Sequence, residues 1–325
     1  MVLKSARRRS HTAAATPYKM SVWQDFLSQA GLISRYPSLV EGLTYGFQAH
    51  IPPLSQTFTP PNSLSIKQYK AIFDDIVHKE FAKQQYIGPL SESEMKQILG
   101  HFQSSPLSIT PKLGQPGKYH MIQDLSHPRG SSTVQSINAR ISPDEFTAMY
   151  STFPIVSLLM SSLPPGSQGA VRDVAKAYCT IPVHPSQWHG LVVCLSDSHF
   201  AIDTALYFGF GPSVGIYENV ASVGADIMHF IGIGPILQWV DNHLFIHIPH
   251  IHLHSYNEQC REAAAHIAAH GGPAVHGGQF WFKGSTLPDG SIEEYNEDCT
   301  SELCNFTATR DTCIDTNPHA YNLCN

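Results

Sequence analysis

The chain has 325 residues, of which 42% are hydrophobic and 14% are charged. This length is enough for two domains or one elaborate domain with a substantial core, and apolar runs such as 231–240 are too short to span a bilayer. The formal net charge is −6, but 285–325 alone carries −7 from eight acidic residues and one Arg, so the rest carries +1. This distribution neither excludes nor requires a phosphate-rich ligand.

The two ends of the chain carry opposite charges and few apolar residues. Residues 1–20 are basic, rich in Ser, Ala and Thr, and lack the apolar stretch of a signal peptide. They are either a targeting address or a solvated arm. Residues 48–64 contain four Pro, which is typical of an extended linker. We therefore expect a basic disordered arm and Pro-rich linker over 1–64, and an acidic, Cys-containing, disordered tail over 286–325.

The cysteines indicate the cellular setting. All seven are scattered, and no CxxC pair occurs among them. This pattern is typical of a reducing compartment and argues against a zinc ribbon. We expect an intracellular protein of the nucleus or cytoplasm that does not enter a membrane, and no stable protein partner can be inferred.

The first half of the chain predicts two helices and a hairpin. Apolar residues at helical spacing predict a helix that Ser65 caps and that runs to about Lys83. A second helix begins near Ser91, where SESE resembles a capping box. Two short extended runs, 105–112 and 118–126, flank a turn and predict a hairpin.

After a break at 163–167 the pattern becomes strand, helix and hairpin in alternation. The sequence predicts a strand at 169–175, hairpins at 191–205 and 235–248, and helices at 212–230 and 255–270. The first of these hairpins turns at Asp197 and Ser198. This order predicts an α+β fold with helices on one face of an antiparallel sheet.

Two aspartates lie at expected strand ends. The stretch ILQWVDNHLFI has apolar arms around Asp241 and Asn242, and we expect these two residues to form the hairpin turn. Asp173 follows a short apolar strand, and pairing of the two strands would bring both carboxylates together. Two nearby carboxylates repel, and a hard divalent cation relieves that repulsion. The alternative is that each Asp makes a turn or caps a helix.

Several motifs in order resemble those of reverse transcriptases, which are RNA-directed DNA polymerases. They cover 65–285 and are most similar to retroelement chains of the fungal type. The motifs are PK at 111–112 with KYHMIQD at 118–124, DVAKAY at 173–178 with CTIPVHP at 179–185, FGFGPS at 208–213, WVDN at 239–242, and FWFKG at 280–284, which resembles a primer-grip strand.

The resemblance implies a right-hand polymerase fold. It implies fingers over 65–165 and a palm over 166–285, with a central antiparallel ferredoxin-like sheet and helices on one face. The implied activity is template-directed nucleotidyl transfer by two Mg²⁺ or Mn²⁺ ions. The implied partners are an RNA or DNA template–primer and dNTPs.

The resemblance also implies residue roles. Asp173 and Asp241 would hold the two metal ions. Tyr178 would be the steric gate against a ribose 2′-hydroxyl, although a plain core aromatic is the other interpretation. Lys112 would contact the triphosphate, and the loop at Phe208 and Gly209 would approach the nucleotide closely.

Two departures from the family pattern put the activity in doubt. Asn242 replaces the second Asp of the hairpin and removes one negative charge. His120 stands where the family has an Arg, and a neutral imidazole cannot replace a charged bidentate fork. A catalytically inactive relic that binds nucleic acid or protein is therefore the alternative function. A third hypothesis is an unrelated α+β protein with chance matches.

A run of histidines offers one more interpretation. His250, His252 and His254 would share a face in an extended segment. A metal site there is one hypothesis, and solvated or partly buried histidines are the preferred one, because zinc sites need a closed ligand set.

Overall fold

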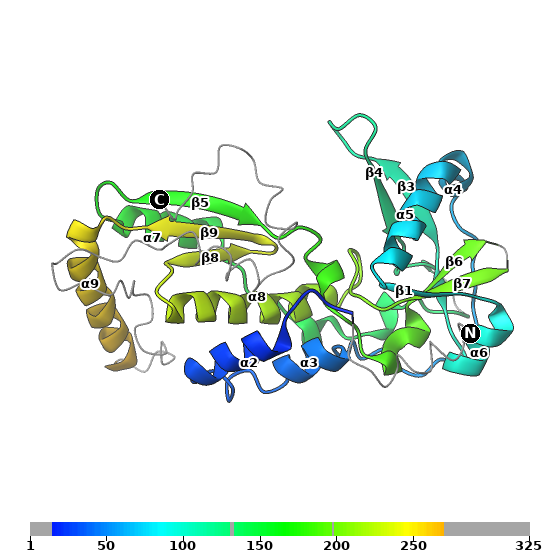
Figure 1. Cartoon of the computed structure of the whole chain (residues 1–325), viewed down its shortest axis with the longest axis horizontal. Helices are drawn as coiled ribbons and strands as arrows, with labels where there is room; N and C mark the ends of the chain where they lie inside the picture. The colour runs from blue at the N-terminus through cyan, green and yellow to red at the C-terminus, as the bar shows by residue number, and fades with distance from the viewer. Residues whose placement is uncertain (1–14, 131–132, 197, 270–325) are drawn as a thin grey trace. The chain divides into compact units, whose positions relative to one another are not determined.

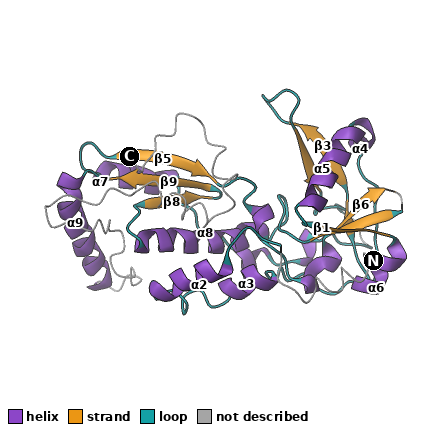
Figure 2. Ribbon diagram, in the orientation of Figure 1, coloured by secondary structure: helices purple, strands orange, loops and turns teal. Residues whose placement is uncertain are grey.

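The computed structural model describes residues 15–130, 133–196 and 198–269 (Figure 1). The basic arm up to residue 14, the primer-grip motif at 280–284 and the acidic tail at 286–325 lie outside the described residues. The described part is a mixed α+β structure with three separate sheets (Figure 2), which confirms the predicted class.

The chain divides into two compact units, each assembled from segments that are far apart in the sequence. Unit 1 contains 38–148 and 176–217, together with the described residues up to 16. Unit 2 contains 17–37, 149–175 and the described residues from 218 to 269. The chain therefore leaves and re-enters each unit, and the two units are described separately below.

The larger sheet of unit 1 has the strand order β1-β7-β6-β2. β1–β7 and β7–β6 pair antiparallel, and the short β2 pairs parallel to β6. The strands are β1 (Tyr86–Leu90), β2 (Ser104–Ser105), β6 (Val192–Ser196) and β7 (His199–Asp203). The β6–β7 hairpin is the one predicted at 191–205, but it belongs to this sheet and not to the sheet that carries Asp173.

Helices of unit 1 pack against both faces of its larger sheet. The helices and 3-10 turns are α3 (Leu39–Tyr45), α4 (Leu64–Gln68), α5 (Lys70–Ala82), α6 (Glu92–Leu99), η1 (Asn138–Arg140), η2 (Pro143–Phe146), η3 (Tyr178–Thr180) and η4 (Pro185–Gly190). Met95 of α6 packs in one cluster with Val192 and Ile202, while Phe73 of α5 packs in another with Val193 and Ala201. Adjacent strand residues point to opposite faces, so each face receives its own helix.

The hairpin expected near residue 115 is present as a sheet of two strands. β3 (Leu107–Pro111) pairs antiparallel with β4 (Tyr119–Gln123), and Thr110 lies opposite His120. Leu107 and Ile109 are buried in the cluster that contains Phe73, so one face of the hairpin is attached to α5.

Unit 2 contains an antiparallel sheet of three strands in the order β5-β9-β8, which run side by side in Figure 1. These strands are β5 (Gln168–Asp173), β8 (Ile236–Trp239) and β9 (Asn242–His247). Its helices are α2 (Met20–Gln29), α7 (Phe153–Ser162), α9 (His250–Ala269) and α8 (Ser213–Phe230), which belongs to unit 2 from Glu218 on.

One small apolar cluster joins the sheet of unit 2 to two helices. Ile246 and Ile248 are buried with Leu253 and Tyr256 of α9, and Leu159 of α7 packs against them. Along the chain, the elements named for this unit after β5 follow in the order α8, β8, β9 and α9.

Several elements differ from the sequence prediction. Helices α2 and α3 occur where an irregular arm was expected, and they bury Trp23, Leu27, Leu39 and Leu43. Each helix presents an i, i+4 apolar pair, which is enough for one buried stripe. The Pro-rich segment after them is extended as expected but is packed, because Phe58 exchanges backbone hydrogen bonds with Phe102 and Ser104.

The predicted cap of the first long helix is wrong by two residues. The Ser63 side chain accepts a hydrogen bond from the Ser65 amide at 3.3 Å, so Ser63 is the N-cap of α4. Ser65 is unavailable for that role because its hydroxyl oxygen accepts from the Ile109 amide of β3 at 3.0 Å. The capping box at Ser91 and Glu94 is confirmed.

The histidine run is also different from the expectation. α9 begins at His250, so His250, His252 and His254 lie in its first turns and not in an extended segment. On a helix, His250 and His254 share a face while His252 does not, and His254 lies 3.3 Å from the Glu258 carboxylate. The argument for a shared histidine face therefore fails.

In the part of the chain that the structure describes, every helix is too short or too polar to cross a membrane.

Candidate functional site

Three candidate residues meet at one end of the unit 2 sheet. Asp173 is the last residue of β5 and lies opposite Asn242, the first residue of β9. The Val174 amide donates to the Asp241 carbonyl at 2.9 Å, which extends the pairing one step beyond the strands. The register therefore brings together Asp173, Asp241 and Asn242 although about 70 residues separate them in sequence.

The turn that carries Asp241 is shifted by one residue from the prediction. Trp239 pairs with Asn242, so the two turn residues are Val240 and Asp241, and Asn242 is in the strand. Val240 has a backbone φ of +54°. A β-branched residue rarely adopts this left-handed conformation, whereas Asp and Asn tolerate it. Turn preferences therefore pointed to the wrong pair.

Asp173 and Asp241 form a pair of like charges at this end of the sheet. The pKa of Asp173 is raised, first by partial desolvation and then by the Asp241 carboxylate. Asn242 donates its amide to Asp241 Oδ1 at 3.2 Å, which is a long and uncharged contact. Burial lowers the pKa of the neighbouring His243, so its imidazole is neutral at pH 7 and does not offset the carboxylates.

These residues fit a divalent cation in their donor chemistry. Two carboxylates that repel each other and one amide oxygen are the oxygen ligands that Mg²⁺ prefers, and Mg²⁺ usually keeps several non-protein ligands. Among the described residues, no group of three or more His, Cys, Asp or Glu side chains is placed to hold a metal ion. The protein would thus supply Asp173 and Asp241, with Asn242 beside them.

The residues expected to contact the nucleotide lie in unit 1. Tyr178 is 5% exposed, and its ring centroid lies 4.6 Å from that of Phe208 and 5.6 Å from that of Tyr217. The Tyr178 ring is therefore packed among aromatics, while Phe208 is half exposed. This packing agrees with the core-aromatic interpretation, and the steric-gate role stays a prediction.

The backbone conformation at position 209 explains why this residue is a glycine. Its φ is +86°, a conformation that favours glycine, and a Cβ would meet only the Gln123 carbonyl oxygen at 3.9 Å. Asn138 holds this loop from both sides, because it donates to the Gly209 carbonyl at 2.7 Å and accepts from the Gly211 amide at 2.9 Å. No local motif marks Asn138, so the sequence analysis missed it.

Lys112 and His120 lie on the β3–β4 hairpin. The Lys112 amide donates to the Lys118 carbonyl at 2.8 Å, just beyond the last strand pair. The pKa of His120 is lowered by burial and then by the Lys112 charge, so His120 is neutral at pH 7. The hairpin consequently lacks the permanent charge that an Arg at 120 would give.

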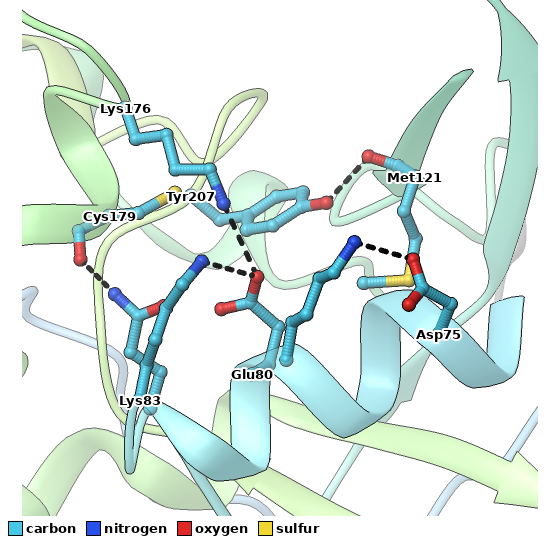
Figure 3. Close-up of polar contacts among 9 residues, drawn as sticks. Asp75, Glu80, Lys83, Met121, Lys176, Cys179 and Tyr207 are labelled. Carbon is cyan, nitrogen blue, oxygen red and sulfur yellow. Dashed lines mark hydrogen bonds and ion pairs between the residues drawn. The ribbon is translucent and has the colours of Figure 1, made fainter. Parts of the chain in front are cut away.

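A further polar cluster in unit 1 was not foreseen (Figure 3). Glu80 of α5 receives the ammonium groups of Lys83 and Lys176, and Tyr207 donates its hydroxyl to the Met121 carbonyl at 2.6 Å. The only signal in the sequence was Lys176 itself, in the middle of DVAKAY.

The chain has limited likeness to known proteins. No family model and no curated protein matches it. Among solved structures it is similar to the protease–reverse transcriptase of prototype foamy virus, CSH mutant, with 18% sequence identity and a TM-score of 0.41. The match covers 65% of this chain and 24% of that chain, so it spans about a quarter of the length of the viral protein. A score at this level does not establish a common fold.

Proposed function

We propose that the chain is a reverse-transcriptase-like domain that performs template-directed nucleotidyl transfer with Mg²⁺ or Mn²⁺ on an RNA or DNA template–primer and dNTPs. The observation that carries the proposal is the β5–β9 register, which sets Asp173 opposite Asn242 with Asp241 in the adjoining turn. The motif order along the sequence supports the same function. In this proposal the β5-β9-β8 sheet is the palm, and the setting is the nucleus or cytoplasm.

The chain's own residues would divide the work. Asp173 and Asp241 would hold the metal ions, and Lys112 would attract the triphosphate. Tyr178, backed by Tyr217 and Phe208, would present a fixed ring to the sugar. Metal ions held by Asp173 and Asp241 would lower the pKa of the primer 3′-hydroxyl and offset the charge of the leaving pyrophosphate.

A second candidate function is a catalytically inactive relic that still binds nucleic acid or protein. The observation that favours it is the Asn242 amide, which donates to Asp241 Oδ1 at 3.2 Å and thus occupies one carboxylate oxygen with a neutral group. Neutral His120 reduces the charge available to phosphates further.

The test is primer extension on an RNA template with Mg²⁺ and, separately, with Mn²⁺. Asp173→Asn should abolish extension, because it removes the negative charge of a metal ligand while keeping the side-chain size. Asp75→Asn is the matched control, since Asp75 pairs with Lys79 on the exposed face of α5 at 2.6 Å. That control should extend like the parent.

Mn²⁺ binding, followed by electron paramagnetic resonance, separates the two functions. A parent chain that binds Mn²⁺ through Asp173 but extends nothing is the inactive relic. A chain that neither binds Mn²⁺ in an Asp173-dependent way nor extends a primer would contradict both functions.

A further inference from the structure

Two lysines of unit 1 converge on one carboxylate oxygen. Lys83 Nζ lies 3.4 Å and Lys176 Nζ lies 3.5 Å from the same Glu80 Oε1 (Figure 3). Lys83 caps the C-terminus of α5 and Lys176 follows β5, so two distant segments supply the pair. The Glu80 side chain is only 15% exposed, whereas those of Lys83 and Lys176 are 44% and 60% exposed.

The pair carries charge that Glu80 does not neutralise. Two ammonium groups against one carboxylate leave one positive charge. Both contacts are longer than the roughly 2.7–2.9 Å of a strong charge-assisted hydrogen bond, and each ammonium has three donors. Within the described structure, Glu80 is the carboxylate that both lysines contact.

The buried titratable groups near the pair are neutral at pH 7. Burial raises the pKa of Asp203 to about 8 and that of the Cys179 thiol to about 12. Burial also raises the pKa of the Tyr86 and Tyr207 hydroxyls above their usual range. The surplus positive charge therefore stays with the two lysines.

Lys176 is held in an unusual backbone conformation. Its φ is +55°, which side chains other than glycine rarely adopt. It follows Asp173 by three residues, so the chain keeps the two Cα atoms within about 11 Å of each other.

We propose that Lys83 and Lys176 form a phosphate-binding pair that Glu80 holds in place. This inference rests on the proposed function for its ligand class, which is the polyphosphate of a nucleotide or the phosphate backbone of a nucleic-acid strand. A phosphate oxygen that bridges the two ammonium groups would use their free donors and relieve their repulsion.

The charges around the pair favour this assignment. The pKa of Lys83 is lowered by burial and then by Lys176, so an anion that bridges both groups would stabilise the charged form of Lys83. His120 is neutral, so the pair would add positive charge that His120 does not give.

The experiment titrates the full chain, without metal, with two probes: inorganic tripolyphosphate and a fluorescein-labelled single-stranded oligonucleotide. The variants are Lys83→Gln and Lys176→Gln. Lys79→Gln is the control, because Lys79 lies on the same helix and pairs with Asp75 instead. Lys176→Gly is a second variant at that position, since Gly adopts a φ of +55° without strain.

Each of the Lys83 and Lys176 variants should weaken binding by about tenfold, the effect of one lost charge-assisted contact. Lys79→Gln should weaken it less than about twofold, as expected for an exposed charge. Lys176→Gly should keep the parent's thermal transition and still lose affinity.

The following results would support or contradict the proposal that Lys83 and Lys176 bind phosphate. A loss with tripolyphosphate supports the pair with a nucleotide as ligand, and a loss confined to the oligonucleotide supports it with a strand phosphate. Failure of the parent to bind either probe, or an equal loss in Lys79→Gln, would overturn it. Primer extension is not a readout here, so a chain that binds tripolyphosphate through the pair but does not extend a primer would contradict the proposed function alone.

Discussion

Val240 combines a β-branched side chain with a left-handed backbone conformation. A β-branched residue at a φ of +54° carries a strain of about 1–3 kcal/mol. Val240→Gly should therefore leave the free energy of unfolding unchanged or raise it by up to about 1 kcal/mol, because relief of strain offsets the extra freedom of Gly in the unfolded chain. Urea unfolding measures this change.

Val171→Gly is the matched control in the same sheet. Val171 is exposed in the extended strand β5, so Gly there should lower the free energy of unfolding by about 0.5–1 kcal/mol. Equal losses in the two variants would contradict the strain assigned to Val240.

Asp203 should make stability depend on pH. Its pKa is raised to about 8 by burial, whereas an unfolded Asp titrates near pH 4. Between these values the folded chain holds a proton that the unfolded chain releases, so stability falls as pH rises, by up to about 1.4 kcal/mol per pH unit. Asp203→Asn keeps an oxygen for the Ala205 amide, which donates to Asp203 at 3.2 Å, and removes this dependence.

The thermal transition of both proteins at pH 5 and pH 8 checks this prediction. The parent should lose stability relative to Asp203→Asn on going to pH 8. Parallel changes in the two proteins would show that Asp203 is charged in the folded chain.

At the scale of single residues, the sequence predicts what local chemistry controls. Asp173 and Asp241 could be predicted as strand-end carboxylates, and their meeting follows from strand pairing. The roles of Asn138 and Glu80 could not be predicted, because Asn138 bonds Gly209, 71 residues away, and Glu80 contacts Lys176, 96 residues away. The turn at Val240 was missed because tertiary context overrides turn preference there.

At the scale of elements, α7 has two different faces. It contains no buried residue, and Phe153 is 82% exposed, yet Leu159 packs against the cluster of Ile246 and Tyr256. Leu159→Ala should lower the free energy of unfolding by about 1–2 kcal/mol, less than for a fully buried leucine. Phe153→Ala should change it by less than about 0.5 kcal/mol.

Chemical unfolding of the two variants side by side tests which face of α7 is attached. The reverse ranking, with Phe153→Ala the more damaging, would show that the exposed face is covered in solution.

Element boundaries were predictable where one local interaction dominates. The capping box at Ser91 is such a case, because both of its hydrogen bonds join residues three apart. The start of α4 was misplaced because the Ser65 hydroxyl bonds to Ile109, 44 residues away. Likewise, alternation among the histidines gave no sign that Leu253 and Tyr256 would bury one face of a helix.

At the scale of the whole molecule, composition could not locate the two units. Each unit combines segments from three parts of the chain, so neither unit is one contiguous range of the sequence. The predicted fingers at 65–165 and palm at 166–285 are contiguous ranges, whereas unit 1 takes 38–148 and 176–217. Long-range strand pairing, such as Tyr86 with Asp203, determines the membership.

The proposed function assigns the metal ligands to unit 2 and the triphosphate contacts to unit 1, so it requires both units to act on one substrate. Asn242→Asp restores a carboxylate to unit 2, and His120→Arg restores a bidentate fork to unit 1. Each change should raise primer extension on RNA, and together they should raise it by about 100-fold or more, since one charge-assisted contact is worth roughly tenfold.

Two further variants make this prediction decisive. Gln115→Arg adds the same charge at the turn of the β3–β4 hairpin and should not substitute for His120→Arg, because position matters as much as charge. Asp173→Asn in the doubly repaired chain should abolish the gain. A repaired chain that extends no better than its parent would show that missing charge is not what limits the reaction, and an equal gain from Gln115→Arg would reduce the effect to non-specific attraction of nucleic acid.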